Sequence, residues 1–159
     1  MDILLLLYDQ QFGRLHRRSI ELIEATPAEK LYWKPRESRE GLPSYSCGEH
    51  VLRSAGVVEQ TFGGITANLW DDPFEWTLPE TLSSQKSIVN YLREVDETRR
   101  RGFEFFRGDG DLGKEIVVPS GEKQTIQLLL MDTLVRVAHH QGCAIATFRL
   151  FSDKTIPWG

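Results

Sequence analysis

Residues 126–151, IQLLLMDTLVRVAHHQGCAIATFRLF, carry the most apolar helical pattern in the chain. Their large apolar side chains recur every three or four positions, which gathers them on one face of an α-helix. Thr125, a residue type that caps helix N-termini, stands just before them. The pattern predicts a helix over 126–151 that is the most buried in the protein. Its predicted buried residues are Ile126, Leu129, Leu130, Leu134, Val137, Ile145 and Phe148.

Three further segments, 2–25, 46–69 and 84–106, have the same apolar period. The second begins with Ser46-Cys47-Gly48-Glu49, a capping box in which the Ser and Glu side chains each bind a backbone amide. Only residues 115–121 suggest a short extended segment or hairpin. Four helices of about 20 residues therefore predict one all-α domain over residues 1–159, folded as a four-helix bundle.

The two chain segments that follow the first helix have local signals of their own. Thr26-Pro27-Ala28-Glu29 has the form of another capping box, which predicts a short helical turn ending near Trp33. Residues 36–45, which contain Gly41 and Pro43, are predicted to form a loop. The leucine-rich run 3–7 has no basic segment before it and no cleavage site after it, so we expect the buried start of a helix rather than a signal peptide.

Composition limits the classes of partner. The net charge of −4 argues against binding nucleic acid or an anionic membrane through bulk electrostatics. The basic run 99–101 closely follows three acidic residues, so we expect a solvated helix face there. The two cysteines, Cys47 and Cys143, are too few for a disulfide framework. Buried free thiols in a reducing compartment, and hence a cytoplasmic protein, are the expectation.

The four histidines are the residues best suited to chemistry. His16 stands alone on the first helix and is expected at the surface or in packing. His139 and His140 are adjacent on the last helix, about 100° apart, so they do not share a face and cannot easily bind one ion together. His50 lies on the second helix. The spacing of the histidines alone indicates a metal site only weakly.

Asp132, Arg136 and His140 share a face of the last helix, at positions i, i+4 and i+8. Polar groups in so apolar a helix are costly to bury unless they are paired or bind a ligand. One interpretation is a ligand pocket. The other is an Asp132–Arg136 ion pair on the surface.

Several motifs together resemble the DinB-like (YfiT-like) superfamily of four-helix bundles, over nearly the whole chain. The resemblance implies an up-down-down-up bundle that is often dimeric. Many members hold a divalent metal with three histidines, and some are thiol-dependent S-transferases. The motifs that carry the resemblance are Trp33-x-Pro35, residues 46–53 (SCGEHVLR), residues 136–142 (RVAHHQG), Phe148-Arg149-Leu150 and Pro157.

The chain departs from the superfamily at its metal ligands. The usual histidine of the second helix corresponds to Arg53, and the first of the two histidines of the last helix corresponds to Arg136; only His140 matches. Arginine stays protonated and has no lone pair to donate to a metal. On this alignment the usual metal site cannot form.

Two functional hypotheses follow. In the first, the domain binds a small anionic molecule without metal, or is a vestigial enzyme, and its pocket between the second and fourth helices contains Arg53, Arg136, His140, Asp132 and Glu49. In the second, His50 and His140 form a shifted site for Zn²⁺ or Ni²⁺ in a thiol transferase or hydrolase. Whether the protein is an enzyme stays open.

The predicted partners are a small molecule and a second copy of the chain; no membrane or nucleic acid is expected. The homodimer is implied by the resemblance to the superfamily. The aromatic loop of Trp70, Phe74 and Trp76 is either part of the dimer interface or packed over one end of the bundle.

Overall fold

The computed structural model describes residues 2–75 and 77–156 and is dominated by four long helices. The helices are α1 (Ile3–Ala25), α2 (Cys47–Ala67), α3 (Gln85–Glu104) and α4 (Ile126–Phe148). The shorter elements are the 3-10 turns η1 (Ala28–Lys30), η2 (Pro73–Glu75) and η3 (Asp109–Gly113), and the strands β1 (Glu115–Val117) and β2 (Lys123–Thr125). The predicted all-α bundle is confirmed, with one small antiparallel hairpin.

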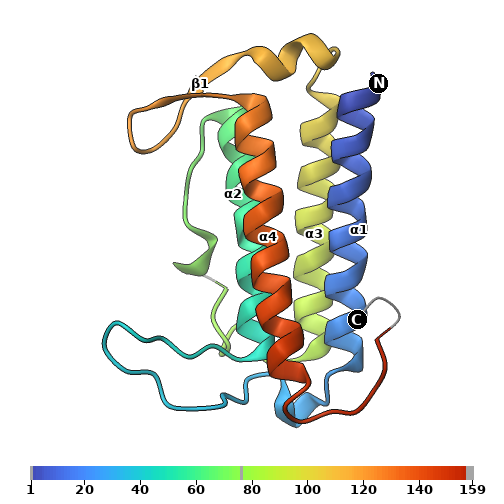
Figure 1. Ribbon diagram of the computed structural model, residues 1–159, viewed down its shortest axis with the longest axis vertical. Helices are drawn as coiled ribbons and strands as arrows, with labels where there is room; N and C mark the ends of the chain where they lie inside the picture. Colours follow the sequence, from blue (N-terminus) through green and yellow to red (C-terminus); the bar gives the residue numbers. More distant parts are fainter. Residues whose placement is uncertain (1, 76, 157–159) are drawn as a thin grey trace.

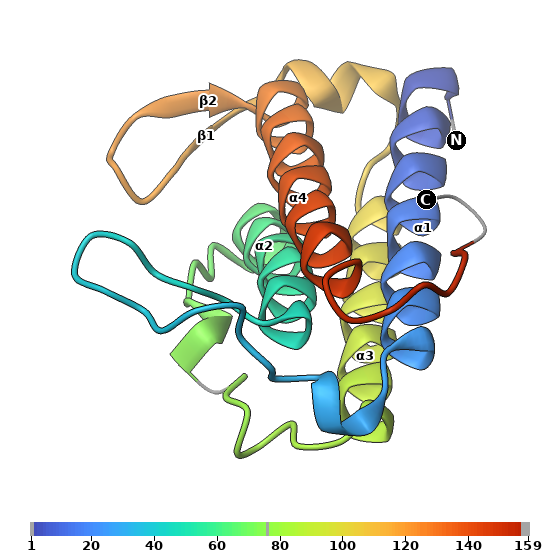
Figure 2. The same ribbon diagram turned by 60° about the horizontal axis from the view of Figure 1, so that its bottom comes forward.

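The helices pack side by side, with α1 and α4 running in one direction and α2 and α3 in the other (Figure 1). Because α2 and α3 are parallel, residues 68–84 must return along the length of the bundle between them (Figure 1). The connection from α1 to α2 and the C-terminal segment lie at the opposite end of the bundle from the β1–β2 hairpin (Figures 1 and 2). No helix in the described part of the chain is long and apolar enough to span a membrane.

Three of the four predicted helix starts coincide with side-chain caps. The Ser46–Glu49 capping box is present, and Ser84 and Thr125 accept hydrogen bonds from backbone amides at the starts of α3 and α4. The capping box predicted at Thr26 is wrong. The Thr26 hydroxyl instead donates to the Leu22 carbonyl at the end of α1, which leaves η1 without a side-chain cap.

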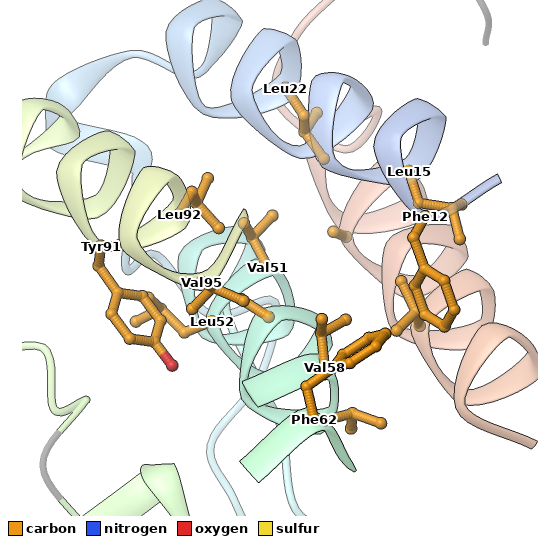
Figure 3. Packing of buried hydrophobic residues seen from close by; sticks show 14 of the residues in the cluster. Phe12, Leu15, Leu22, Val51, Leu52, Val58, Phe62, Tyr91, Leu92 and Val95 are labelled. Carbon is orange, nitrogen blue, oxygen red and sulfur yellow. The ribbon is translucent and has the colours of Figure 1, made fainter. Parts of the chain in front are cut away.

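The core lies between the four helices and contains a cluster of aromatic rings among its aliphatic side chains (Figure 3). The rings of Phe12 and Phe62 meet edge to face at 5.5 Å, and Phe103 lies 5.2 Å from Phe62. Gly102 makes room for this cluster, since a Cβ there would come within 2.2 Å of the Phe62 ring. Close packing of α3 on α2 therefore depends on a missing side chain.

Two predictions of burial are wrong. Of the leucine-rich run 3–7, only Leu5 is buried, because one helical turn turns only one side chain in three or four toward the core. The α4 helix is also not the most buried: 8 of its 23 residues are buried, against 13 of 21 in α2. Periodicity located the inward face of α4 correctly, but its outward face is apolar too. Leu128, Met131 and Val135 are all exposed there.

Candidate functional site

The candidate site lies where the first turns of α2 face the second half of α4. The Ser46–Glu49 capping box fixes the start of α2 and so places His50 in its first turn. Across the helix contact, the rings of His50 and His140 lie 6.3 Å apart between centroids. Further along the same contact, a hydrogen bond of 2.8 Å joins the buried hydroxyls of Thr61 and Thr133 and fixes the register of the two helices.

The pKa values of both facing imidazoles are lowered. Burial lowers the pKa of His50, and the nearby Arg53 guanidinium lowers it further. Burial also lowers the pKa of His140, to about 4. Electrostatic repulsion lowers it further, and the groups responsible are His50, His139, Arg53 and Arg136. The Nδ1 atoms of His50 and His140 are buried and have no hydrogen-bond partner among the described residues. Unsatisfied ring nitrogens of this kind are typical of sites that receive water, an ion or a ligand.

Arg53 is held beside the histidines by aromatic rings from two loops. Its guanidinium carbon lies 4.0 Å from the centroid of the Tyr45 ring and 4.5 Å from that of Phe74. The Tyr45 ring also meets His50 edge to face at 5.5 Å, and Phe74 packs against Gly56, where a Cβ would come within 2.9 Å of its ring. Within the described part of the chain, no carboxylate lies within 4.0 Å of this guanidinium. Its charge is therefore stabilised by ring faces and left open to an anion.

Glu49 is near the site but already has partners. One carboxylate oxygen accepts from the Ser46 amide at 2.8 Å and from the Ser46 hydroxyl at 2.9 Å, and the other lies 3.3 Å from the Lys34 ammonium. The sequence predicted this capping box and also placed Glu49 among the residues of the ligand pocket. The structure uses its carboxylate for the cap and for Lys34.

Asp132 and Arg136 are both exposed on α4. Among the residues that the structure describes, no ion pair within 4.0 Å joins them, so the predicted Asp132–Arg136 surface pair is not observed. The two arginines that were expected in one interior pocket also differ in solvent exposure, since Arg53 is half-buried and Arg136 is exposed. Of the five predicted pocket residues, the structure places Arg53 and His140 near each other and adds His50.

Four neighbours of the site were not among the predicted pocket residues. The ring of His139 lies 5.6 Å from that of His140, and the half-buried Cys143 places its sulfur 3.9 Å from Nε2 of His139. The i, i+4 spacing of His139 and Cys143 was visible in the sequence. No local signal placed Tyr45 and Phe74 on Arg53, because that contact joins two distant loops.

The histidines could supply two nitrogen ligands to a metal. Protein zinc sites use at least three protein ligands. In the described residues, no group of three His, Cys, Asp or Glu side chains is arranged to hold a metal ion. The shifted metal site thus has two of its ligands near each other and stays a prediction.

A second polar cluster lies between α1 and α3 and corrects the interpretation of the basic run 99–101. Arg99 is buried, not solvated: its guanidinium donates to a carboxylate oxygen of Asp96 at 2.9 Å and also pairs with Asp9. His16 lies close by, and its pKa is lowered by burial, against the opposing effect of Asp96. The adjoining cavity of about 30 Å³ has room for a water molecule but not for an organic ligand.

The two thiols differ in environment. Cys47 is fully buried, and burial raises its pKa to about 11, so it is predicted to be unreactive. The pair of buried thiols expected from the sequence is confirmed for Cys47, whereas Cys143 is partly exposed.

The sequence has no significant match to a protein-family model, a curated protein or a solved structure.

Proposed function

We propose that the α2–α4 site binds a small anionic molecule through Arg53 and the imidazoles of His50 and His140. The observation that carries the proposal is the half-buried Arg53 guanidinium, which lies over two aromatic rings without a carboxylate partner in the described residues. A carboxylate or phosphate would complete it through charge-assisted hydrogen bonds. The unpartnered ring nitrogens of both histidines supply further hydrogen-bonding positions.

The charges around the site favour an anion over a cation. The groups that lower the pKa of His140 include two arginines and no opposing carboxylate, and at His50 the effect of Arg53 on the pKa exceeds the opposing effect of Glu49. A divalent cation would meet the same positive charges. An anion would instead favour the protonated imidazoles, so its affinity should rise as the pH falls.

The test is a titration of the full chain with inorganic phosphate and with succinate, followed through the ring resonances of His50 and His140. Arg53→Met removes the charge but keeps an apolar stem between the two rings, and it should weaken binding at least tenfold, since a charge-assisted hydrogen bond contributes about 1.5–3 kcal/mol. Arg93→Met, which removes an exposed arginine of α3, is the matched control and should bind like the wild type. Equal affinities in the two variants would count against the proposal.

The facing histidines support a second candidate, a divalent-metal site in an enzyme of the thiol-transferase or hydrolase kind. The supporting observation is the pair of unpartnered Nδ1 atoms on rings 6.3 Å apart. A bound Zn²⁺ or Ni²⁺ would lower the pKa of a coordinated water or thiol. Titration of tag-free protein with these ions separates the candidates: stoichiometric uptake that His50→Gln abolishes would favour the metal site.

We also propose that the chain is a DinB-like protein. The support is the order of helix directions, with α1 and α4 opposed to α2 and α3, together with the positions of the sequence motifs on α2 and α4. An experimental structure that showed a different connection of the four helices would remove this assignment.

A further inference from the structure

A basic groove between α1 and α3 lies apart from the α2–α4 site. The two helices pack side by side (Figure 1), and a groove of about 670 Å³ lies along their contact. Pockets of roughly 300–1,000 Å³ are typical of sites for small molecules. In the described part of the chain, residues of α1 and α3 alone line the groove, among them Asp9 and the arginines Arg14, Arg17, Arg99 and Arg100. Its size suits a small molecule, and its arginines indicate an anion.

Arg99 presents an unused donor group to this groove. The residue is only 5% exposed, and two carboxylates hold its guanidinium in place. Its Nε donates to Asp96 at 2.9 Å, and its Nη1 donates to the backbone carbonyl of Asp9 at 3.2 Å and to the carboxylate of the same residue. Among the described residues, Nη2 has no hydrogen-bond acceptor. A buried guanidinium with an unused N–H group at a groove points to a ligand that accepts from it.

Gly13 leaves space beside this donor group. A Cβ atom at Gly13 would lie 3.8 Å from Nη2 of Arg99 and 3.8 Å from Nη1 of Arg17, so the two guanidiniums approach the same point from α3 and from α1. These are ordinary contact distances, so packing does not require a glycine here, as it does at Gly102. Glycine is also unfavourable inside a helix. The missing side chain instead keeps the space between the two guanidiniums open.

The positive charges of the groove exceed the negative charges around it. Asp9 lines the groove and Asp96 lies next to Arg99, so four arginines face two carboxylates, which leaves an excess of two positive charges. Glu21 of α1 and Glu97 of α3 lie on neighbouring turns and do not line the groove. The whole chain carries a net charge of −4, so this positive region is local and favours a small anion over a nucleic acid.

The two arginines of α1 are available to such an anion. Arg14 and Arg17 are exposed and lie three residues apart, so their side chains are neighbours on the helix surface. In the part of the chain that the structure describes, neither has an ion pair within 4.0 Å. Arg100 of α3, in contrast, pairs with Asp96 at 3.0 Å. An anion in the groove therefore meets two guanidiniums from α1 and the unused N–H group of Arg99 from α3.

We propose that the groove binds a small molecule through a linear polyphosphate group of two or three linked phosphates. One phosphate lies over Gly13 and accepts from Nη2 of Arg99 and Nη1 of Arg17. Its tetrahedral oxygens can accept from guanidiniums on two sides, whereas a carboxylate accepts within one plane. The next phosphate reaches Arg14, and the groove of about 670 Å³ has room for it.

The first test is a titration of the full chain with inorganic tripolyphosphate in about 0.15 M salt, which screens exposed charges more than about 8 Å apart. Binding is followed through the ring resonances of His16, which lines the small cavity beside Arg99. Arg17→Gln removes an exposed charge and should weaken binding about tenfold or more, the loss expected for a charge-assisted hydrogen bond. Arg39→Gln removes an exposed arginine from the loop before α2 and should bind like the wild type. Arg99 is kept, because its loss would leave the buried Asp96 without this partner.

The proposal would be overturned by an absence of binding, or by an equal loss of affinity in Arg17→Gln and Arg39→Gln. Shifts at His50 and His140 with none at His16 would also overturn it, since they would place the anion in the α2–α4 site alone. The two anion sites can therefore fail separately. Citrate, which carries carboxylates in place of phosphates, should bind about tenfold more weakly than tripolyphosphate. Equal affinities would show that the groove does not select phosphates.

The second test fills the groove without changing its charge. Gly13→Leu places a side chain between the two guanidiniums, and Gly142→Leu in α4 is the matched control, because a Cβ there meets nothing within 4 Å. Circular dichroism checks that both variants are folded. Gly13→Leu should lose about tenfold or more in affinity for tripolyphosphate, since the phosphate would lose its place between Arg17 and Arg99, whereas Gly142→Leu should bind like the wild type. Wild-type affinity in a folded Gly13→Leu variant would contradict the proposal.

Discussion

Protonation of His140 should destabilise the protein at mildly acidic pH, and this effect can be isolated with one substitution. The folded site keeps the ring neutral because burial and nearby positive charges lower its pKa from 6.5 to about 4. In the unfolded chain the ring regains its ordinary pKa of about 6.5. The unfolded state therefore binds more protons between about pH 4 and 6.5, and the free energy of unfolding must fall as the pH falls through this interval.

The size of the effect follows from the two pKa values. A change from 6.5 to about 4 corresponds to about 3.4 kcal/mol when the ring is protonated in both states. At about pH 5 the same linkage gives about 2 kcal/mol, because the folded ring is still mostly neutral there. The His140 side chain is only half-buried, and solvent screens its neighbours, so about 1 kcal/mol is the expected effect.

The assay is urea unfolding of the wild type and of His140→Gln at about pH 7.5 and about pH 5. Glutamine is neutral at both, so its stability should fall by about 1 kcal/mol less than that of the wild type between the two conditions. The carboxylates titrate in both proteins, so their contribution to the pH dependence of stability cancels when the two proteins are compared. His140 should also titrate near pH 4 when its ring resonances are followed directly. Identical pH dependence in the two proteins would refute the reasoning.

Two packing predictions concern the bundle itself. Gly102→Ala should lower the free energy of unfolding by about 1–3 kcal/mol, because its Cβ would come within 2.2 Å of the buried Phe62 ring, and chemical denaturation measures the loss. Thr133→Val should lower the free energy of unfolding by about 1 kcal/mol more than Thr61→Val does. The Thr133 proton is donated to the Leu129 carbonyl, so Thr61 must be the donor in their shared hydrogen bond and would lose its acceptor. Equal costs would show that the donor is assigned wrongly.

Local signals in the sequence were enough to locate the helices. The observed starts of α2 and α4 follow directly after the predicted caps, Ser46 and Thr125, because capping depends on neighbouring residues only. Burial was harder to predict. Val51 and Phe62 are buried as expected, but the exposed leucines at the start of α1 have the same composition as core residues. Whether a leucine at the start of α1 is buried depends on which side of α1 the other helices pack against.

The candidate site was only partly accessible from the sequence. His50 and His140 were singled out because both lie near the positions where the superfamily that the chain resembles has its metal ligands. The structure places their rings 6.3 Å apart between α2 and α4, tilted by 38°. The environment of Arg53 could not be foreseen, since Tyr45 and Phe74 reach it from separate loops. A carboxylate close to Arg53 in the sequence, such as Glu49, would be its most obvious partner. Glu49 instead completes the cap of its own helix.

The predicted burial of α4 was too great because the helix is apolar on its outer side as well as on its inner side. The residues that α4 turns toward the other helices, such as Leu130, Val137 and Phe148, account for its packing within one chain. Met131 and Val135 are not needed for that packing, and exposing them carries a cost in free energy of hydration. A helix with apolar residues on its outer side as well as its inner side is typical of one that is buried in a larger assembly.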